Sequence, residues 1–285
     1  MRLLLAAAAA ATVAATTSAS PRLAGGASVQ KLALYIGAGA GYQPTYHAVL
    51  STAAASAFGP AGFTLANLTA AAVGQLTPEQ YDVVVFPGGS GNGQAGAVGA
   101  AGLEALRRFV SAGKGYIGTC GGSFLGLQHV GFYLPSNHTP SCGLKPLPHC
   151  TPTTQQPWDR GDGDVLIEFT QAGLEQLNLP PSTYGGNVTI FYGQGPIVKP
   201  EALLSTVSQL AFYRTEIHSK HPAETTGEMV NTPAITTLDG YLMPGRSEGQ
   251  GQGGRVVLNS PHPELTQPPI PAIYAGELQW VTRQR

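Results

Sequence analysis

The sequence is poor in charge. Asp, Glu, Lys and Arg together make up 11% of the 285 residues, and the formal net charge is -1, whereas a soluble protein usually has about a quarter of its residues charged. Lys and Arg form no cluster and do not alternate with aromatic residues, so the electrostatic basis for binding nucleic acid is missing. We therefore expect no nucleic-acid partner.

Metal and nucleotide motifs are also absent. The sequence has no CxxC pair and no HExxH, and its seven histidines are scattered. The glycines at 37–41 lack the spacing of a dinucleotide fingerprint, and no GxxxxGK[ST] occurs. We expect no cofactor and no metal. His129, His138 and His149 are interpreted as exposed loop residues.

Long apolar runs are missing beyond the first residues. No later run approaches the ~18 residues that span a bilayer, so we expect no membrane span in the mature chain. Residues 1–19 differ: Arg2 precedes three leucines and a run of alanines, and small residues follow up to Ala19. This is the layout of a secretory signal peptide, whereas a transit peptide carries several arginines. We expect a secreted protein with a single domain over residues 20–285.

Cysteine is scarce, with three in the chain. Cys142 and Cys150 bracket a short loop, and such a pair readily closes a disulfide in an oxidising compartment. Cys120 is then the odd thiol. Three glycosylation acceptor triplets, each weak alone, agree with secretion; they begin at Asn67, Asn137 and Asn187.

Apolar runs alternate with helical segments in the first half of the chain. This order predicts an α/β fold with a mostly parallel sheet and helices on both faces. The expected strands are residues 31–36, 63–67, 81–86 and 115–119, and the expected helices are 45–57 and 103–110. A loop-rich insertion is expected at about 135–164. Later strands, partly antiparallel, are expected at 165–169, 187–192 and 209–213. The last strand is expected at 255–260, before a helix near Pro271.

Residues 118–122, Gly-Thr-Cys-Gly-Gly, indicate a strand that turns sharply into a helix with the Cys120 thiol at the apex. Glycines suit such a nucleophile elbow because the backbone is strained and neighbouring chains come close. The alternative is a buried structural cysteine. The glycine-rich ends at 37–41, 88–91 and 118–122 should meet at the carboxyl edge of the sheet, where active-site loops gather.

A cysteine nucleophile needs a base, and the base needs a partner that fixes its tautomer. His262 and Glu264 follow the last expected strand, two positions apart, and so lie on the same side of an extended stretch. Pro261 and Pro263 keep this stretch extended. By itself His-Pro-Glu could be a surface turn.

The elbow, the Pro-Gly-Gly loop at 87–89 and the terminal His-Pro-Glu together resemble class I glutamine amidotransferase-like domains. More narrowly, residues 86–89, 115–122 and 254–264, with weaker support from 192–196, resemble the biotin-protein ligase N-terminal domain-like group. The likeness covers about residues 31–264. It implies a flavodoxin-like fold with Cys120 as nucleophile, His262 as base and Glu264 as its orienting partner. It also implies an oxyanion hole from the N–H groups of Gly121 and of Gly88 or Gly89.

One departure bears on function. Glutamine amidotransferases have a glutamine four residues after the cysteine, and here that position is Phe124. No synthetase or biotin-ligase module is recognised, so we expect neither amide transfer nor biotin ligation. We expect a secreted cysteine-dependent hydrolase that acts on an amide, γ-glutamyl or peptide bond of a small-molecule or peptide substrate, as the secretory γ-glutamyl hydrolases of this superfamily do. The alternative is a non-catalytic binding or structural protein on the same fold.

Overall fold

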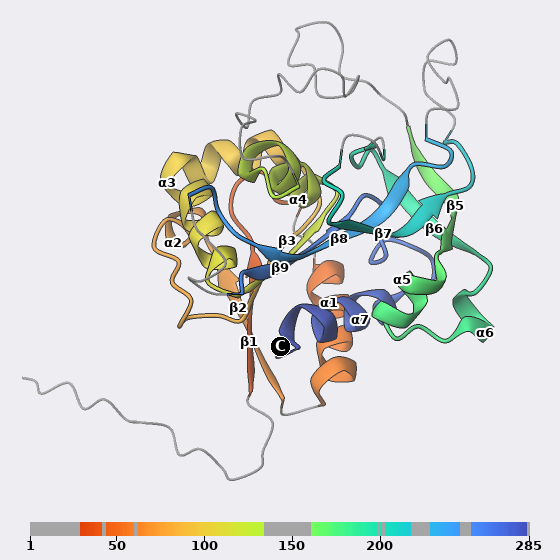
Figure 1. The fold of residues 1–285 in the computed structure, drawn as a ribbon, viewed down its shortest axis with the longest axis horizontal. Helices are drawn as coiled ribbons and strands as arrows, with labels where there is room; N and C mark the ends of the chain where they lie inside the picture. Colours follow the sequence, from red (N-terminus) through yellow and green to blue (C-terminus); the bar gives the residue numbers. More distant parts are fainter. Residues whose placement is uncertain are drawn as a thin grey trace, which may run out of the picture.

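The computed structural model describes residues 29–41, 44–59, 62–133, 161–198, 200, 203–217, 229–245 and 252–283. A nine-stranded sheet runs through them in the order β2-β1-β3-β4-β9-β8-β7-β5-β6, with helices on both faces (Figure 1). The predicted α/β fold class is confirmed.

One half of the sheet is parallel. It consists of β1 (Gln30–Tyr35), β2 (Phe63–Leu68), β3 (Val83–Phe86), β4 (Gly115–Thr119) and β9 (Gly254–Asn259). Taken in chain order, these strands lie 2-1-3-4-5, which is the flavodoxin-like arrangement. β3 and β4 are buried along their whole length, which explains why their sequences are continuous apolar or small-residue runs.

The other half is antiparallel. It consists of β8 (Pro233–Tyr241), β7 (Val207–Tyr213), β5 (Asp162–Phe169) and β6 (Asn187–Gly193). The sequence did not predict β8. The predicted insertion also ends too late, because β5 begins at Asp162 rather than after residue 164. The reason is that the polar start of β5 pairs with β6, from Asp162 opposite Gly193 onward, and does not form an apolar run.

The helices divide between two layers (Figure 1). α1 (Pro44–Phe58) and α7 (Pro271–Thr282) pack on one face around Leu34, Val85 and Ile117, and α5 (Gln171–Gln176) packs on the same face against β5 and β7. The other face carries α2 (Ala70–Val73), α3 (Gly91–Ser111), α4 (Gly121–Phe124) and the π-helix η1 (Leu125–Val130). A short helix, α6 (Pro181–Tyr184), precedes β6.

His129 corrects one sequence interpretation. It lies in η1, partly buried, and its Nε2 is 2.8 Å from Asn92 Oδ1. The expected exposed loop is therefore a helix at this position, because the helix after the elbow runs on to Val130, where its apolar side chains are buried against the sheet.

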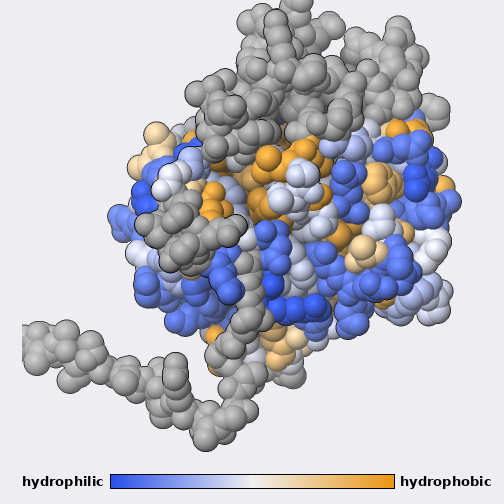
Figure 2. Space-filling view, in the orientation of Figure 1, coloured by the Kyte–Doolittle hydropathy of each residue, from blue (hydrophilic) through white to orange (hydrophobic). Residues whose placement is uncertain are grey.

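The described surface is mostly hydrophilic on the side shown in Figure 2, with smaller apolar areas between. Within the described ranges, the one large hydrophobic side chain that is exposed is Val29, at 49%. No helix in this part of the chain has the length and apolar character needed to cross a bilayer.

Candidate active site

The elbow is a strained turn between β4 and α4. Cys120 has φ 49° and ψ −103°, a conformation that costs energy in a residue with a side chain. The turn is pressed against the end of β3: a Cβ on Gly122 would lie 2.0 Å from the Phe86 carbonyl oxygen, and one on Gly121 would lie 2.4 Å from that of Gly89. Only glycine fits at either position, because real Cβ atoms do not approach a backbone oxygen this closely.

The three glycine-rich strand ends meet, as the sequence predicts. The Gly41 N–H donates to the Gly88 carbonyl at 2.7 Å, and the Ser90 N–H donates to the Gly39 carbonyl at 2.8 Å. Gly88 also lies beside the site, because a Cβ there would be 2.6 Å from His262 Cε1. The loop after β3 therefore forms one wall of the site.

His262 follows β9 and is fixed to β6. Its N–H donates to the Phe191 carbonyl at 2.7 Å, while the Phe191 N–H donates to Thr266 Oγ1 at 3.0 Å. The His262 Nδ1 lies 2.7 Å from Glu264 Oε1. With Nδ1 occupied in this way, Nε2 faces the side of Gly193 and Cys120.

A chain of hydrogen-bonded, buried hydroxyl groups leads to the Glu264 carboxylate. The Tyr274 hydroxyl of α7 donates to Glu264 Oε2 at 2.7 Å. The same hydroxyl lies 3.0 Å from Thr119 Oγ1. Thr119 Oγ1 in turn lies 3.3 Å from the Tyr46 hydroxyl of α1. Burial raises the pKa of both tyrosines far above 10, so both keep their protons. Sequence reasoning missed this chain, because nothing local distinguishes these tyrosines from ordinary core residues.

The electrostatics of the site favour a charged imidazole. Burial alone lowers the pKa of His262, but hydrogen bonds with Cys120 and Glu264, together with their negative charge, outweigh burial and raise the pKa to about 10. The site therefore favours the protonated form of the His262 imidazole, which lies between a carboxylate and the elbow sulfur.

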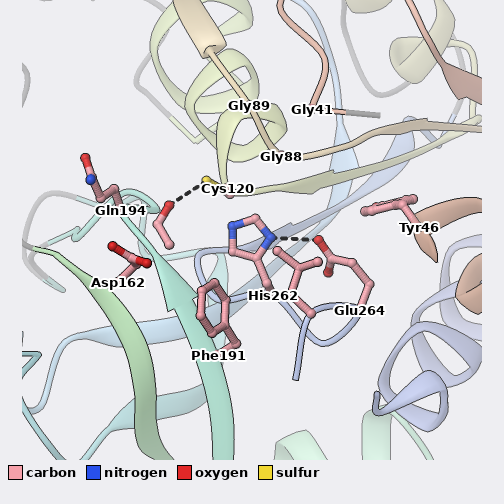
Figure 3. A pocket seen from close by; sticks show the side chains of 12 residues that line it. Gly41, Tyr46, Gly88, Gly89, Cys120, Asp162, Phe191, Gln194, His262 and Glu264 are labelled. Atoms are coloured by element: carbon pink, nitrogen blue, oxygen red, sulfur yellow. Dashed lines mark hydrogen bonds and ion pairs between the residues drawn. The ribbon is translucent and has the colours of Figure 1, made fainter. Parts of the chain in front are cut away.

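Cys120 is a free thiol that is 5% exposed, and its Sγ donates to the Gly193 carbonyl at 3.3 Å. It opens into a pocket of about 320 Å³, shown in Figure 3. The pocket has walls from both halves of the sheet. Its lining residues are Gly41, Tyr46, Gly88, Gly89, Cys120, Asp162, Phe191, Gly193, Gln194, His262, Glu264 and Leu265.

The structure thus brings most of the predicted site residues together. Cys120, His262, Glu264, Gly88 and Gly89 line one pocket. Gly121 does not line it, but packs against the Gly89 backbone from behind. Phe191, Gln194 and Asp162 were missed as site residues, and of the three only Gln194 lies within the weak Tyr/Gly-rich likeness at residues 192–196.

The other predicted sites lie elsewhere. Asn67 and Asn187 are exposed, on β2 and at the start of β6. Asn137, Cys142 and Cys150 lie outside the described residues, so the glycosylation and the disulfide stay predictions. Within the described ranges, no group of three or more His, Cys, Asp and Glu side chains is placed to hold a metal ion.

A second carboxyl group lies beneath the elbow. The Asn259 carbonyl accepts from the Cys120 N–H at 2.8 Å and from the Ser123 hydroxyl at 2.6 Å. The Asn259 side chain donates to Glu277 Oε2 at 3.0 Å. Burial, opposed by this hydrogen bond and reinforced by the nearby Glu264, raises the pKa of Glu277 to about 8. Glu277 is therefore largely protonated at neutral pH.

The central part of this chain matches a known protein family. Residues 64–157 match the family model described as "Biotin-protein ligase, N terminal". The match covers about a third of the chain and includes the loop at 87–89 and Cys120, but it ends before His262 and Glu264. It supports the resemblance to the class I glutamine amidotransferase-like and biotin-protein ligase N-terminal group. No curated protein matches the chain.

Several solved structures are similar at low identity. A protein from Thermoplasma acidophilum, described as part of a GMP synthase, is 12% identical and has a TM-score of 0.46, with 87% of this chain and 94% of that chain covered. A cytoplasmic protein from Salmonella typhimurium is 12% identical with a TM-score of 0.48, over 90% of this chain and 100% of that one. A ThuA-like protein from Bacteroides uniformis is 14% identical with a TM-score of 0.45, over 90% and 92%.

Proposed function

We propose that the protein is a secreted hydrolase that cleaves an amide, γ-glutamyl or peptide bond through a Cys-His-Glu triad. The observation that carries the proposal is the position of His262. One ring nitrogen is fixed by Glu264 at 2.7 Å, and the other side of the ring faces the thiol of a strained strand-to-helix turn. A nucleophile, a base and an orienting carboxylate in this order are what acyl transfer through a thioester needs.

The reaction would run in two halves. The Cys120 thiol gives its proton to His262, the sulfur attacks the substrate carbonyl carbon, the C–N bond breaks, and the His262 imidazolium gives that proton to the departing amine. Water then attacks the thioester and gives a proton to His262, and the carboxylic acid leaves as the sulfur is released. In the tetrahedral intermediate of each half the substrate oxygen would be negative, and the backbone N–H groups of Gly121 and of Gly88 or Gly89 would stabilise it.

Two features limit the range of substrates. Phe124 replaces the glutamine of glutamine amidotransferases and lies on the helix that leaves the elbow. The pocket of about 320 Å³ is small and is lined by Tyr46, Phe191 and Leu265 as well as by polar groups. A small acyl group is therefore a better substrate than a folded protein chain.

A thiol-labelling experiment tests the triad without a known substrate. An ordinary thiol, with a pKa of about 8.5, reacts with iodoacetamide roughly tenfold faster for each pH unit between 6 and 8. Because a protonated His262 stabilises a thiolate beside it, we expect Cys120 to label at pH 6 at least about tenfold faster than a model peptide. Mass mapping identifies the labelled cysteine.

His262→Gln should remove the fast labelling at pH 6, whereas Glu175→Gln, an exposed change on α5, should leave it intact. Turnover is then tested by a screen of amide, γ-glutamyl and peptide substrates with the wild type against Cys120→Ala. Slow labelling of Cys120 together with no turnover would contradict the hydrolase hypothesis and favour a non-catalytic binding protein on this fold.

A further inference from the structure

Gln94 is a buried amide that lies behind the loop at 87–89. It belongs to the first turn of α3, is 0% exposed and does not line the pocket. Its Nε2 donates to the Pro87 carbonyl at 2.9 Å and, more weakly, to the Gly88 carbonyl at 3.4 Å. Its Oε1 has no hydrogen-bond partner among the described residues. A buried acceptor without a partner costs free energy, so this side chain contributes through its NH2 group.

The two carbonyls that Gln94 holds determine where two N–H groups point. In a trans peptide the carbonyl and the N–H point in opposite directions. The Pro87 carbonyl shares its peptide with the Gly88 N–H, and the Gly88 carbonyl shares its peptide with the Gly89 N–H. Because both carbonyls are held on the Gln94 side, both N–H groups are turned to the other side, which is that of the pocket lined by Gly88 and Gly89.

Neither of these N–H groups is used within the described part of the protein. No described residue accepts a hydrogen bond from the N–H of Gly88 or Gly89. A Cβ on Gly88 would lie 3.6 Å from the Cys120 Cβ, so this backbone lies beside the thiol. Backbone donors next to a nucleophile can stabilise a substrate oxygen that becomes negative.

The peptide between Gly88 and Gly89 has to be held because it can turn over easily. Its reversal changes ψ of Gly88 and φ of Gly89, and glycine tolerates a wide range of both angles. Gly89 already has a φ of 116°, which disfavours other residues. The reversed peptide would point the Gly88 carbonyl into the pocket in place of the Gly89 N–H. The Gly41 N–H, at 2.7 Å from that carbonyl, and the Gln94 amide oppose the reversal.

We propose that Gln94 is a positioning residue of the oxyanion hole. It keeps the carbonyls of Pro87 and Gly88 turned away from the pocket, so that the N–H groups of the same two peptides face the substrate oxygen. This inference rests on the proposed function and adds to it a residue that touches neither the substrate nor the thiol. Loss of the amide should therefore weaken the binding of a negative or hydroxyl oxygen and leave the reactivity of Cys120 unchanged.

Butyraldehyde tests the oxyanion hole separately from the thiol. The Cys120 sulfur adds to the aldehyde carbon, the carbonyl π bond opens and the oxygen takes the thiol proton, which gives a reversible thiohemiacetal. Iodoacetamide instead alkylates the sulfur with loss of iodide and needs no oxyanion hole. The experiment measures the labelling rate of Cys120 at pH 6 and the dissociation constant of butyraldehyde, obtained from its protection of Cys120 against labelling. 1-Butanol, which cannot add to a thiol, controls for simple occupation of the pocket.

We expect Gln94→Met to raise the butyraldehyde dissociation constant about fivefold to fiftyfold, with the labelling rate within about twofold of the wild type. Methionine is as long as glutamine but has no N–H donor. Gln94→Asn is the second variant if methionine does not pack, because its amide is one methylene shorter and cannot reach both carbonyls. Gln176→Met is the matched control, since that amide donates to Thr237 Oγ1 at 2.8 Å and neither residue lines the pocket.

The outcomes separate this inference from the hydrolase. A dissociation constant that is the same in Gln94→Met and the wild type overturns the inference, even if the enzyme hydrolyses amides. An equal loss of labelling and of aldehyde binding also overturns it, because it would mean a merely structural role. A wild type that butyraldehyde does not protect overturns it as well, whereas fast labelling at pH 6 would still support the triad. A raised constant in Gln94→Met without turnover of any substrate supports the positioning role and contradicts the hydrolase.

Discussion

Glu264 uses both of its carboxylate oxygens, one for His262 and one for the Tyr274 hydroxyl. The second contact matters because a carboxylate with one partner can rotate, whereas one held at both oxygens fixes the plane in which the imidazole can bond. At the scale of single residues, the geometry of the site therefore depends on a tyrosine of α7 that does not line the pocket.

We predict that Tyr274→Phe weakens the site by removing one hydrogen bond to a charged group. Such bonds contribute about 1.5–3 kcal/mol, so labelling of Cys120 by iodoacetamide at pH 6 should slow by about tenfold or more. Tyr133→Phe is the matched control, because that buried hydroxyl donates to the Thr236 carbonyl at 2.9 Å. A merely structural role for Tyr274 would lower stability in both variants and leave the pH profile of labelling unchanged in each.

The elbow and the loop after β3 act as one element. The Gly122 N–H donates to the Pro87 carbonyl at 3.1 Å, and the Gln94 side chain of α3 donates to the same carbonyl at 2.9 Å. Close backbone contact between the two segments holds the thiol beside the peptides that would form the oxyanion hole. The glycines at 121 and 122 are required by this contact.

Gly121→Ala should force the two segments apart, because the added Cβ would lie 2.4 Å from the Gly89 oxygen. We expect a loss of about 1–3 kcal/mol in the free energy of unfolding, typical of overpacking, and slow labelling at pH 6. Gly96→Ala on α3 is the control, since a Cβ there meets nothing within 4 Å. That variant should be as stable as the wild type or more so. Equal behaviour of the two variants in urea unfolding would refute the contact.

At the scale of the whole molecule, the two halves of the sheet supply different parts of the site. The parallel half provides Cys120 and the glycine loops, and the antiparallel half provides Gly193, Phe191 and Asp162. β6 is an edge strand, yet Phe191 forms a bridge with His262. The exposed Asn67 and Asn187 lie on the two edge strands, β2 and β6, and the glycans proposed there would hinder edge-to-edge association.

Stability should depend on pH through the buried Glu277. Its pKa is raised from 4.5 to about 8 on folding, so the folded state binds more protons between these values and stability falls as the pH rises through them. Glu277→Gln lacks this loss. Relative to the wild type, its free energy of unfolding should increase by up to a few kcal/mol from pH 4.5 to 8, measured by urea unfolding.

Glu175→Gln, on the surface of α5, should show no such trend. A difference between Glu277→Gln and the wild type that stays constant with pH would mean that Glu277 does not change its protonation on folding.

The sequence by itself determined the parallel half of the sheet and the chemistry at its edge. Strands buried on both faces must be apolar or small along their length, so the sequence shows β3 and β4 as continuous runs of apolar or small residues. A tight elbow needs glycines beside Cys120, and alternating prolines keep His262 and Glu264 extended. These are local requirements, and the local sequence therefore records them.

Only the tertiary structure decided the remaining parts. β8 was missed because it begins with Pro233 and contains Thr236 and Thr237, which are buried although polar. Tyr274, Glu277 and Asp162 reach the site through the docking of α7 and the register of β5 against β6. Periodicity in a sequence reports which side of a segment is buried. Which buried polar groups then meet depends on contacts between segments far apart in the chain, and only the packed fold specifies these.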